Sequence, residues 1–533
     1  MVWLLNDVYD VEHRAYFMSE KIRSHGASSV MHYDERYTPY IEMTGLLPFV
    51  QLVSRSTPNL NAAAVTALID RWRPETHSFH LQTGEMTVTL QDVSMITALP
   101  IEGKPLCMST DSEGWRQQME ALIGMSPQEP EVEDGGKKDR VPTGATFTWI
   151  AANFAHCPED ADDEVIQRYA RVYMWYVISR TIFADGTGKN APWMWLKALT
   201  VFDNKFSWGS AALAYLYRQL DDACRRTTKD GGVGGCMLLL SWDLVLEVAS
   251  EVNLLYKQYT NEMDSLTPEQ VEWEPYGVGT NFGDAHTFEL NPLCVQERHL
   301  WLMRCPLICN WAVEFHLPHR VLRQFGYFQP HPPEWVDTDT QLHRLDRRRQ
   351  RKIKDWRKHH KSYVLMFEQS VQATSSIQLT QYRQHCALAF SNYLRWFQES
   401  TRVEICPPAY EEDILEEPTE YDELAQGGYS KLIREGYQTS FAPVLNFVAA
   451  DDMTLKAFQR SAYMLKPRKE FKRYSPDDYA KGKNPVAGGS RLSRMRSMDD
   501  EVEDDDDDES DDPEQFVVAR RKKLASKRGR GPK

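Results

Sequence analysis

The segment from His77 to Leu106, HSFHLQTGEMTVTLQDVSMITALPIEGKPL, constrains the fold of this chain more than any other. Two short runs of alternating character, Ser78–Leu81 and Glu85–Leu90, flank a Thr-Gly pair, which predicts a β-hairpin. Thr89 is followed three residues later by Asp92 and then by an apolar-periodic run, a pattern that predicts a capped helix. The segment contains no nucleophile elbow, no phosphate-cradling glycine run and no metal-ligand spacing, so nothing in it predicts a catalytic loop.

Helical patterns dominate the rest of the folded body. Apolar residues recur with a helical period over Ala161–Phe183, and a second helix is expected to start at Ser207 or Ser210 and to run to about Thr227. Further helices are expected to begin near Cys236 and to lie within Leu300–Phe315 and His319–Phe325. Because strand-like runs are few, we predict a mainly α fold with a small β-hairpin, a helical globular domain followed by a disordered acidic and basic C-terminal tail.

Length and composition divide the chain into four parts. At 533 residues, a guide of about 150 residues per domain predicts two or three domains. Prolines after residue 329 and like-charge blocks after residue 484 mark boundaries. We therefore predict an N-terminal helical extension over 1–35, a main domain over 36–329, a basic helical extension over 330–484 and a disordered acidic-basic tail over 485–533.

Targeting and redox signals are consistent with an intracellular protein. The first residues lack a signal-peptide pattern, and no apolar run reaches the roughly 20 residues of a membrane span. Nine cysteines without regular spacing predict reduced thiols in cytosol or nucleus. We expect no membrane association.

Four blocks of sequence carry a family resemblance. They are RWRPETH with the segment that follows it (Arg71–Leu106), FSWGSAALAYLYRQLDDACRR (Phe206–Arg226), GGCMLLLSWDLVLE (Gly234–Glu247) and CPLICNWAVEFHLPHRVLRQFG (Cys305–Gly326). In this order they resemble the plant mobile domain family, which is also labelled aminotransferase-like or phosphatase 7 long form homologue and is related to MAINTENANCE OF MERISTEMS proteins. The resemblance runs from about Arg36 to Gln329, so the main domain is expected to be a plant mobile domain. It implies a domain shared between plant transposable elements and host nuclear proteins, some of them tied to transposon silencing and meristem maintenance, and it implies no known active site.

Two short patterns suggest metal chemistry, but neither has the spacing that such chemistry needs. Cys305, Cys309, His316 and His319 follow C-x3-C-x6-H-x2-H, which matches neither a zinc finger nor a zinc knuckle, and their apolar neighbours favour buried thiols. Gly283–His286 partly resembles a metallophosphatase motif, but the blocks that would hold the remaining ligands of a two-metal site do not occur in the sequence.

Two enzyme classes suggested by the family labels fit no better. A pyridoxal phosphate enzyme usually has an alternating βα scaffold, and a DDE transposase needs a strand-rich sheet. The sequence shows too few strands for either, although spacing alone leaves a transposase-like carboxylate set open. We therefore predict no catalytic residue, no cofactor and no metal ligand.

Basic clusters are the clearest binding signals. The run Asp499–Asp512 is almost entirely acidic, so the net charge of −15 says little about the folded domain. A terminal basic cluster after this run predicts a nuclear import signal, the alternative being a generic basic tail. The import residues are Arg520, Arg521, Lys522, Lys523, Lys527, Arg528 and Arg530.

A second basic run, Leu342–Lys361, predicts a helix that binds either nucleic acid or an import receptor, and the alternative is a solvated helix face that meets acidic neighbours. Its candidate nucleic-acid contacts are Arg347, Arg348, Arg349, Arg351, Lys352, Lys354, Arg357 and Lys358.

Polar and aromatic residues within the family blocks form the last candidate site. They line one interaction groove, or they form internal salt bridges that fix helix packing. The residues are Arg71, Trp72, Arg73, Glu75, His77, Trp208, Arg218, Glu314, His316, Arg320 and Arg323.

The sequence thus predicts a non-catalytic nuclear protein that acts as an interaction module in transposon silencing, gene-expression control or meristem maintenance. Its expected partners are nuclear or chromatin proteins, among them a phosphatase-like protein, with DNA or RNA as a further candidate. The alternative is a transposable-element-encoded protein with transposase-related or metallophosphatase-related activity. Sequence does not separate a host gene from an element gene, nor does it give the partner, the DNA preference or the oligomeric state.

Overall fold

The structure is a computed structural model, and its described residues are those of the helical body. They are residues 13–14, 23–24, 31–55, 62–128, 143–186, 188–225, 232–240, 252–276, 291–333, 342, 353–374 and 382–403. Several predicted features lie outside them: most of the N-terminal extension, the loop 283–286, residues 343–352 of the basic run, and everything from residue 404, including the acidic run and the import signal. None of the helices within these ranges has the length and apolar character needed to cross a membrane.

The predicted hairpin is confirmed as part of a three-stranded antiparallel sheet. Its strands are β2 (Trp72–Arg73), β3 (Ser78–Leu81) and β4 (Gly84–Met86), in the order β2-β3-β4. Phe79 pairs with Met86. The turn places Gly84 at φ 114°, a conformation that side-chain-bearing residues rarely adopt, which explains the glycine there.

The predicted capping box is also confirmed. The Thr89 backbone N–H donates to Asp92 Oδ2 at 2.7 Å, and the Asp92 N–H donates to Thr89 Oγ1 at 3.4 Å. Together they start α5 (Leu90–Asp92), which continues as a π-helical turn over Val93–Thr97. Ala98, with φ 51°, ends this turn, so the helix is shorter than the predicted apolar-periodic run. Its π-helical part is also wider than an α-helix.

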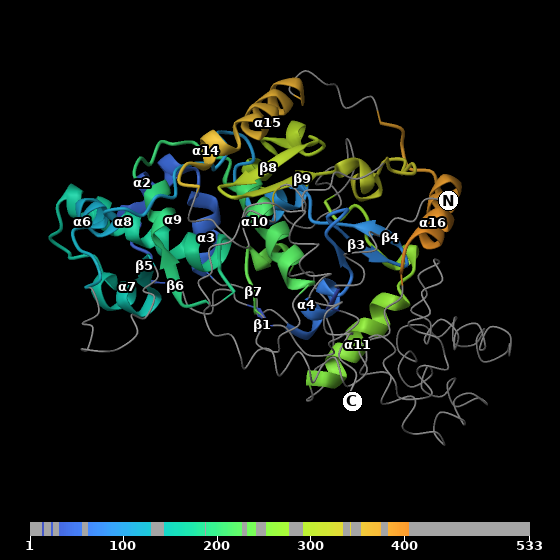
Figure 1. The fold of residues 1–533 in the computed structure, drawn as a ribbon, viewed down its shortest axis with the longest axis horizontal. Coiled ribbons are helices and arrows are strands. Elements are labelled where there is room, and N and C mark those ends of the chain that lie inside the picture. The colour runs from blue at the N-terminus through green and yellow to red at the C-terminus, as the bar shows by residue number, and fades with distance from the viewer. Residues whose placement is uncertain are drawn as a thin grey trace, which may run out of the picture. The chain divides into compact units, whose positions relative to one another are not determined.

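Helices form most of the described body, so the structure is mainly α, as predicted (Figure 1). The strong helix expected over 161–183 is α8 followed by a π-helical turn over Ile178–Ile182. The helices outside the C-terminal part are α2 (Thr38–Thr44), α3 (Leu47–Arg55), α4 (Ala62–Ile69), α6 (Trp115–Ile123), α7 (Phe147–Phe154), α8 (Asp163–Val177), α9 (Trp193–Ala198), α10 (Trp208–Ala223), α11 (Val252–Asp264) and α12 (Pro292–Val295).

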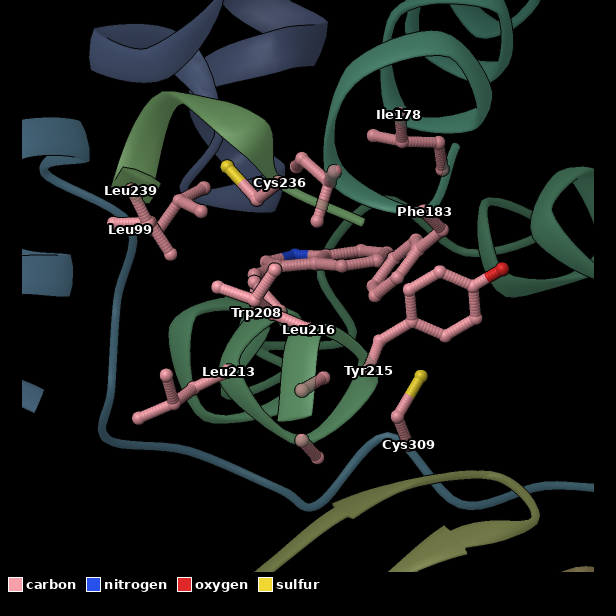
Figure 2. Close-up of a cluster of buried hydrophobic side chains, with 14 of the residues drawn as sticks. Leu99, Ile178, Phe183, Trp208, Leu213, Tyr215, Leu216, Cys236, Leu239 and Cys309 are labelled. Carbon is pink, nitrogen blue, oxygen red and sulfur yellow. The ribbon is translucent and has the colours of Figure 1, made fainter. Parts of the chain in front are cut away.

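Helix α10 lies at the centre of the hydrophobic core. Nearly all of its side chains are buried, and Trp208 and Tyr215 pack around Phe183 (Figure 2). Phe183 also stacks on Trp195 with ring centroids 4.1 Å apart. Ser207 precedes α10 as predicted, but its hydroxyl donates to the Ile101 carbonyl at 2.6 Å instead of capping the helix. This bond ties α10 to the end of the hairpin-helix unit.

Two further sheets of two short strands each lie within the described residues. Strands β5 (Gly144–Thr146) and β6 (Asn190–Pro192) pair antiparallel, and β1 (Arg23–Ser24) pairs parallel with β7 (Gly232–Val233). The helix expected to begin near Cys236 starts as a 3-10 turn over Met237–Leu240. Residues 241–251 lie outside the described residues.

The prediction of a helix within Leu300–Phe315 was wrong. This region forms two antiparallel strands, β8 (Cys305–Cys309) and β9 (Ala312–His316), joined by a turn in which Asn310 has φ 50°. Every residue of β8 is buried, and a short continuous apolar run of this kind does not distinguish a buried strand from a buried helix by period. The helical expectation for 319–325 is met by two 3-10 turns, Pro318–Arg320 and Leu322–Phe325.

Two of the C-terminal described helices, α14 (Trp356–His359) and α15 (Lys361–Thr374), pack onto the main core, whereas the buried aromatic residues of α16 (Ala387–Ser400) form a separate small cluster with Trp273. Helix α15 contacts β8 and α16 contacts β4. Trp356 and Phe367 belong to the main hydrophobic cluster. Helices α14 and α15 therefore share a hydrophobic core with residues that precede residue 330. The basic run is not one continuous helix, because residues 353–355 are not helical and Asp355 caps the short α14.

Candidate functional site

The predicted groove residues lie inside the domain and do not form one groove. All except Arg323 are buried. The structure brings five of the eleven, Trp72, His77, Arg218, Glu314 and Arg320, to two polar clusters, one around His77 and one around Arg320. Two residues that sequence reasoning missed, Asp221 and Glu85, complete these clusters.

The first cluster, here called the His77 cluster, joins the loop after β2 to α10 and β9. His77 Nε2 lies 3.1 Å from Glu314 Oε2 and 3.6 Å from Asp221 Oδ2. Trp72 Nε1 donates to Asp221 Oδ1 at 2.6 Å, and Arg218 Nε donates to Glu314 Oε1 at 2.5 Å. All five side chains are 3% exposed or less, so the cluster is sealed from solvent.

The charges of the two neighbouring carboxylates raise the pKa of the His77 imidazole. Burial by itself lowers the pKa of His77, but the neighbouring Asp221 and Glu314 outweigh it and raise the pKa to about 10. The cluster therefore holds a cation at this position, a proton when nothing else is bound. His77 also has φ 50°, an uncommon conformation for a residue with a side chain, and tertiary contacts hold it there.

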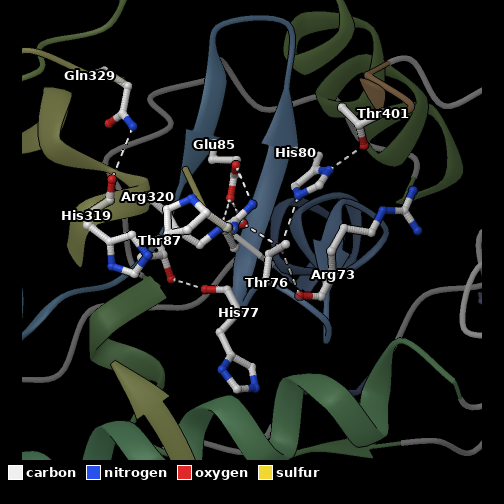
Figure 3. A network of polar contacts seen from close by, with 12 residues as sticks. Arg73, Thr76, His77, His80, Glu85, Thr87, His319, Arg320, Gln329 and Thr401 are labelled. Atoms are coloured by element: carbon white, nitrogen blue, oxygen red, sulfur yellow. Dashed lines mark hydrogen bonds and ion pairs between the residues drawn. The ribbon is translucent and has the colours of Figure 1, made fainter. Parts of the chain in front are cut away.

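The second cluster, here called the Glu85 cluster, lies on the hairpin itself (Figure 3). Arg320 donates to Glu85 through two nitrogens, Nε to Oε2 at 2.6 Å and a terminal NH2 to Oε1 at 2.8 Å. The Ser78 hydroxyl donates to Oε2 at 2.9 Å. The Glu85 backbone N–H in turn donates to the hydroxyl of Tyr393, 3.3 Å away on α16. Arg320 and Ser78 thus supply three internal hydrogen bonds to the Glu85 carboxylate.

A chain of hydroxyl and imidazole groups extends from this cluster toward residue 401. The Thr76 hydroxyl lies 2.8 Å from that of Ser78 and 3.1 Å from His80 Nε2. His80 Nδ1 lies 2.6 Å from the hydroxyl of Thr401. Burial, reinforced by the charge of Arg73, lowers the pKa of His80 well below its usual value, so the ring is neutral at physiological pH.

Other predicted groove residues have separate structural partners. Arg71 donates to the carbonyls of Ala67 and Thr260 at 2.8 Å and forms an ion pair with Asp264. Arg323 pairs with Glu274 at 2.6 Å.

Trp208 and His316 are also tied to the backbone. Trp208 Nε1 donates to the Thr44 carbonyl at 3.1 Å. His316 Nδ1 lies 2.7 Å from the Met303 carbonyl, and burial lowers the pKa of this histidine to about 4. Arg73 and Glu75 are buried beside the hairpin.

The cysteine and histidine pattern around Cys305 does not converge in space. Cys305 and Cys309 lie at opposite ends of β8, and at roughly 3.3 Å per residue their α carbons are about 13 Å apart. Burial raises the pKa of both thiols above the usual value. Cys305 and Cys309 are core residues, as their apolar neighbours predicted.

Only part of the second basic run is described. Lys354 pairs with Asp111 at 3.2 Å and Lys358 with Asp355 at 3.5 Å, both at the surface. Exposed Arg357 borders a cleft of about 350 Å³ whose wall also carries Lys104 and Lys197. The other predicted nucleic-acid contacts, Arg347, Arg348, Arg349, Arg351 and Lys352, lie outside the described residues, as do the seven import residues.

A family model described as Plant mobile domain matches residues 48–246 and 233–398, which together are more than half of the chain. The chain belongs to the plant mobile domain family. Its match includes the hairpin, α10, the β8–β9 pair and most of α16, and thus both polar clusters. The family resemblance predicted from sequence is confirmed.

Curated relatives come from Arabidopsis thaliana. The chain is 30% identical to the protein named "Serine/threonine-protein phosphatase 7 long form homolog" over 65% of its own length and 27% of that protein's. It is 31% identical to "Protein MAIN-LIKE 1" (54% of this chain, 58% of the relative) and 32% identical to "Protein MAINTENANCE OF MERISTEMS" (52% and 59%). The chain therefore spans about a quarter of the first relative and less than two thirds of the others. No solved structure matches it.

Proposed function

We propose that this chain is a non-catalytic nuclear interaction module that acts in meristem maintenance, through transposon silencing or control of gene expression. Its plant mobile domain and its likeness to a protein named for the maintenance of meristems support this role. Nuclear entry is proposed to depend on the basic residues at the C-terminus.

The non-catalytic proposal rests on the burial of the two polar clusters. A catalytic group must reach its substrate. In the described part of the chain, the Glu85 carboxylate is instead engaged by Arg320 and Ser78, and Glu314 by Arg218. These polar groups hold the hairpin to α10 and β9, and they support a structural role.

The surface offers a different kind of site. The cleft beside α14 has three cationic side chains on its wall, Lys104, Lys197 and Arg357, against one carboxylate, Asp355, which already caps α14 and pairs with Lys358. A cationic surface attracts acidic protein segments or phosphate groups. We propose this cleft as the contact for an acidic region of a nuclear or chromatin protein, with DNA or RNA as the alternative ligand. A phosphatase-like protein is the first candidate partner, because one relative carries that name.

Affinity purification from plant nuclei followed by mass spectrometry tests the role. The tagged full chain is compared with the variant Lys104→Glu, Lys197→Glu, Arg357→Glu. A matched control reverses three exposed charges elsewhere: Lys361→Glu, Arg383→Glu and Arg395→Glu. We expect a reproducible nuclear partner set that the cleft variant loses and the control retains.

Two results would contradict this proposal. If the cleft variant and the control variant recover the same partner proteins, the cleft is not the binding site. Turnover of a phosphate ester by the purified chain that disappears with Glu314→Gln would favour the catalytic alternative.

A further inference from the structure

The His77 cluster has the geometry of a metal site. One ligand atom from each of His77, Asp221 and Glu314 lies within 4.8 Å of the others, and all three residues are buried. Two of the separations are 3.1 Å and 3.6 Å, both measured from His77 Nε2. Ligand atoms bound at about 2.0–2.2 Å to one tetrahedral zinc ion lie roughly 3.3–3.6 Å apart. The 3.6 Å separation lies within this range and the 3.1 Å separation slightly below it, so the three atoms are close enough to share one ion.

Surrounding groups hold the other polar atom of each of the three residues. Trp72 Nε1 holds the outer oxygen of Asp221, and Arg218 Nε holds the outer oxygen of Glu314. His77 Nδ1 lies 3.3 Å from the Phe315 carbonyl, which fixes Nδ1 as the protonated nitrogen when Nε2 binds a metal. Outer hydrogen bonds of this kind are the usual support of metal-binding histidines and carboxylates.

His77 Nε2 supplies an independent observation. It is buried and makes no well-directed hydrogen bond within the described residues, although the Glu314 oxygen is only 3.1 Å away. A buried nitrogen that lies 3.1 Å and 3.6 Å from two carboxylate oxygens without a hydrogen bond to either fits coordination of a shared ion. The left-handed backbone at His77 is the strained feature that places the ring there.

We propose that His77, Asp221 and Glu314 bind one zinc ion, which serves as a structural link between the hairpin, α10 and β9. One imidazole and two carboxylates are ligands that zinc accepts, and one enclosed water would complete the usual four. A site with side chains 2% exposed or less takes up its ion as the chain folds, so the metal stabilises the fold. This proposal replaces the expectation from sequence of no metal ligand, and it is independent of the proposed interaction role.

The competing occupant is a proton. With His77 protonated, its charge and that of Arg218 balance the two carboxylates, and no metal is needed. The experiment must therefore distinguish zinc from a proton at the same position.

The test is elemental analysis of the full chain after refolding from denaturant with and without zinc, followed by dialysis against metal-free buffer. We expect about one zinc ion per chain after refolding with zinc and a higher thermal midpoint than that of the zinc-free sample. His77→Asn, Asp221→Asn and Glu314→Gln should each lose the zinc. Glu85→Gln removes a neighbouring buried carboxylate outside the cluster, and it should retain the ion.

Two results overturn the proposal. The first is wild-type protein that refolds with excess zinc, folds, and holds none above background; a proton then occupies the position. The second is full zinc content in all three ligand variants, because the ion would then sit elsewhere. Since the wild-type measurement needs no variant to fold, the test is decisive even if a substitution prevents folding.

Discussion

Breaking the Glu85–Arg320 pair should reveal how much the buried polar residues contribute to stability. Both side chains are 1% exposed or less, and the contact is bidentate. Removing one partner of such a pair leaves an uncompensated buried charge and costs about 3–5 kcal/mol. Glu85→Gln and Arg320→Met should each lower the free energy of unfolding by this amount, which is a large part of the roughly 5–15 kcal/mol that stabilises a typical domain.

The double variant should be far less damaged than the sum of the two. With both charges gone, the remaining losses are the hydrogen bond from Arg320 to the Pro333 carbonyl and a weaker contact of the Ser78 hydroxyl with the glutamine oxygen, each worth about 1 kcal/mol or less. We therefore expect the double variant to lose about 1–2 kcal/mol, which corresponds to a coupling free energy of about 4 kcal/mol or more.

Urea unfolding followed by tryptophan fluorescence measures all four proteins, and the chain has 15 tryptophans as probes. A matched surface control is Arg168→Met, which breaks an exposed pair with Glu164 and should cost under about 1 kcal/mol. Additive losses in the double variant, to within about 0.5 kcal/mol, would refute the reasoning, because they would mean that the two side chains do not stabilise each other.

Four other predictions follow from local features. Gly84→Val should cost about 1–3 kcal/mol in thermal or chemical denaturation, since φ is 114° and the new Cβ would lie 3.1 Å from Tyr393; an unchanged melting curve would contradict the turn. Cys305→Ser should leave the zinc content equal to that of wild type in elemental analysis, and a loss of zinc would show that a thiol binds it. Deleting Pro485–Lys533 should leave the thermal midpoint of the remainder unchanged, because that composition cannot offset its chain entropy; a clear drop would show that the segment docks. Alanine at the seven basic residues between Arg520 and Arg530 should move a fluorescent fusion to the cytoplasm, and a fusion that stays nuclear would leave the second basic run as the import signal.

Local signals in the sequence predicted the elements that local chemistry determines. The hairpin and the Thr89 capping box depend on turn residues and on hydrogen bonds spanning three residues, so they could be predicted from a short window. Strand β8 could not, because all its residues are buried and its apolar run lacks a strand period. The C-terminal segment was predicted to be helical, but nothing local indicated that α14 and α15 join the main core or that α16 packs on the hairpin.

The buried clusters were only half predictable. His77, Arg218 and Glu314 were found because they lie in family blocks, but Asp221 and Glu85, which complete the charge balance of the two clusters, were missed. A signal did exist for Asp221, because it lies three residues after Arg218 and therefore on the same face of α10. Glu85 follows the turn glycine on a buried strand, a position where a charge requires a partner, but the sequence does not say which one.

The packing of α16 on the hairpin has a consequence for folding during synthesis. Tyr393 meets Glu85 across 308 residues of chain, and Thr401 meets His80 across 321. At about 5–20 residues per second, a ribosome needs roughly 15–60 s between delivering the hairpin and delivering the helix that covers it. During that interval the hairpin is an unfinished surface on a nascent chain, so slow synthesis or early termination would leave it open to chaperones and to aggregation.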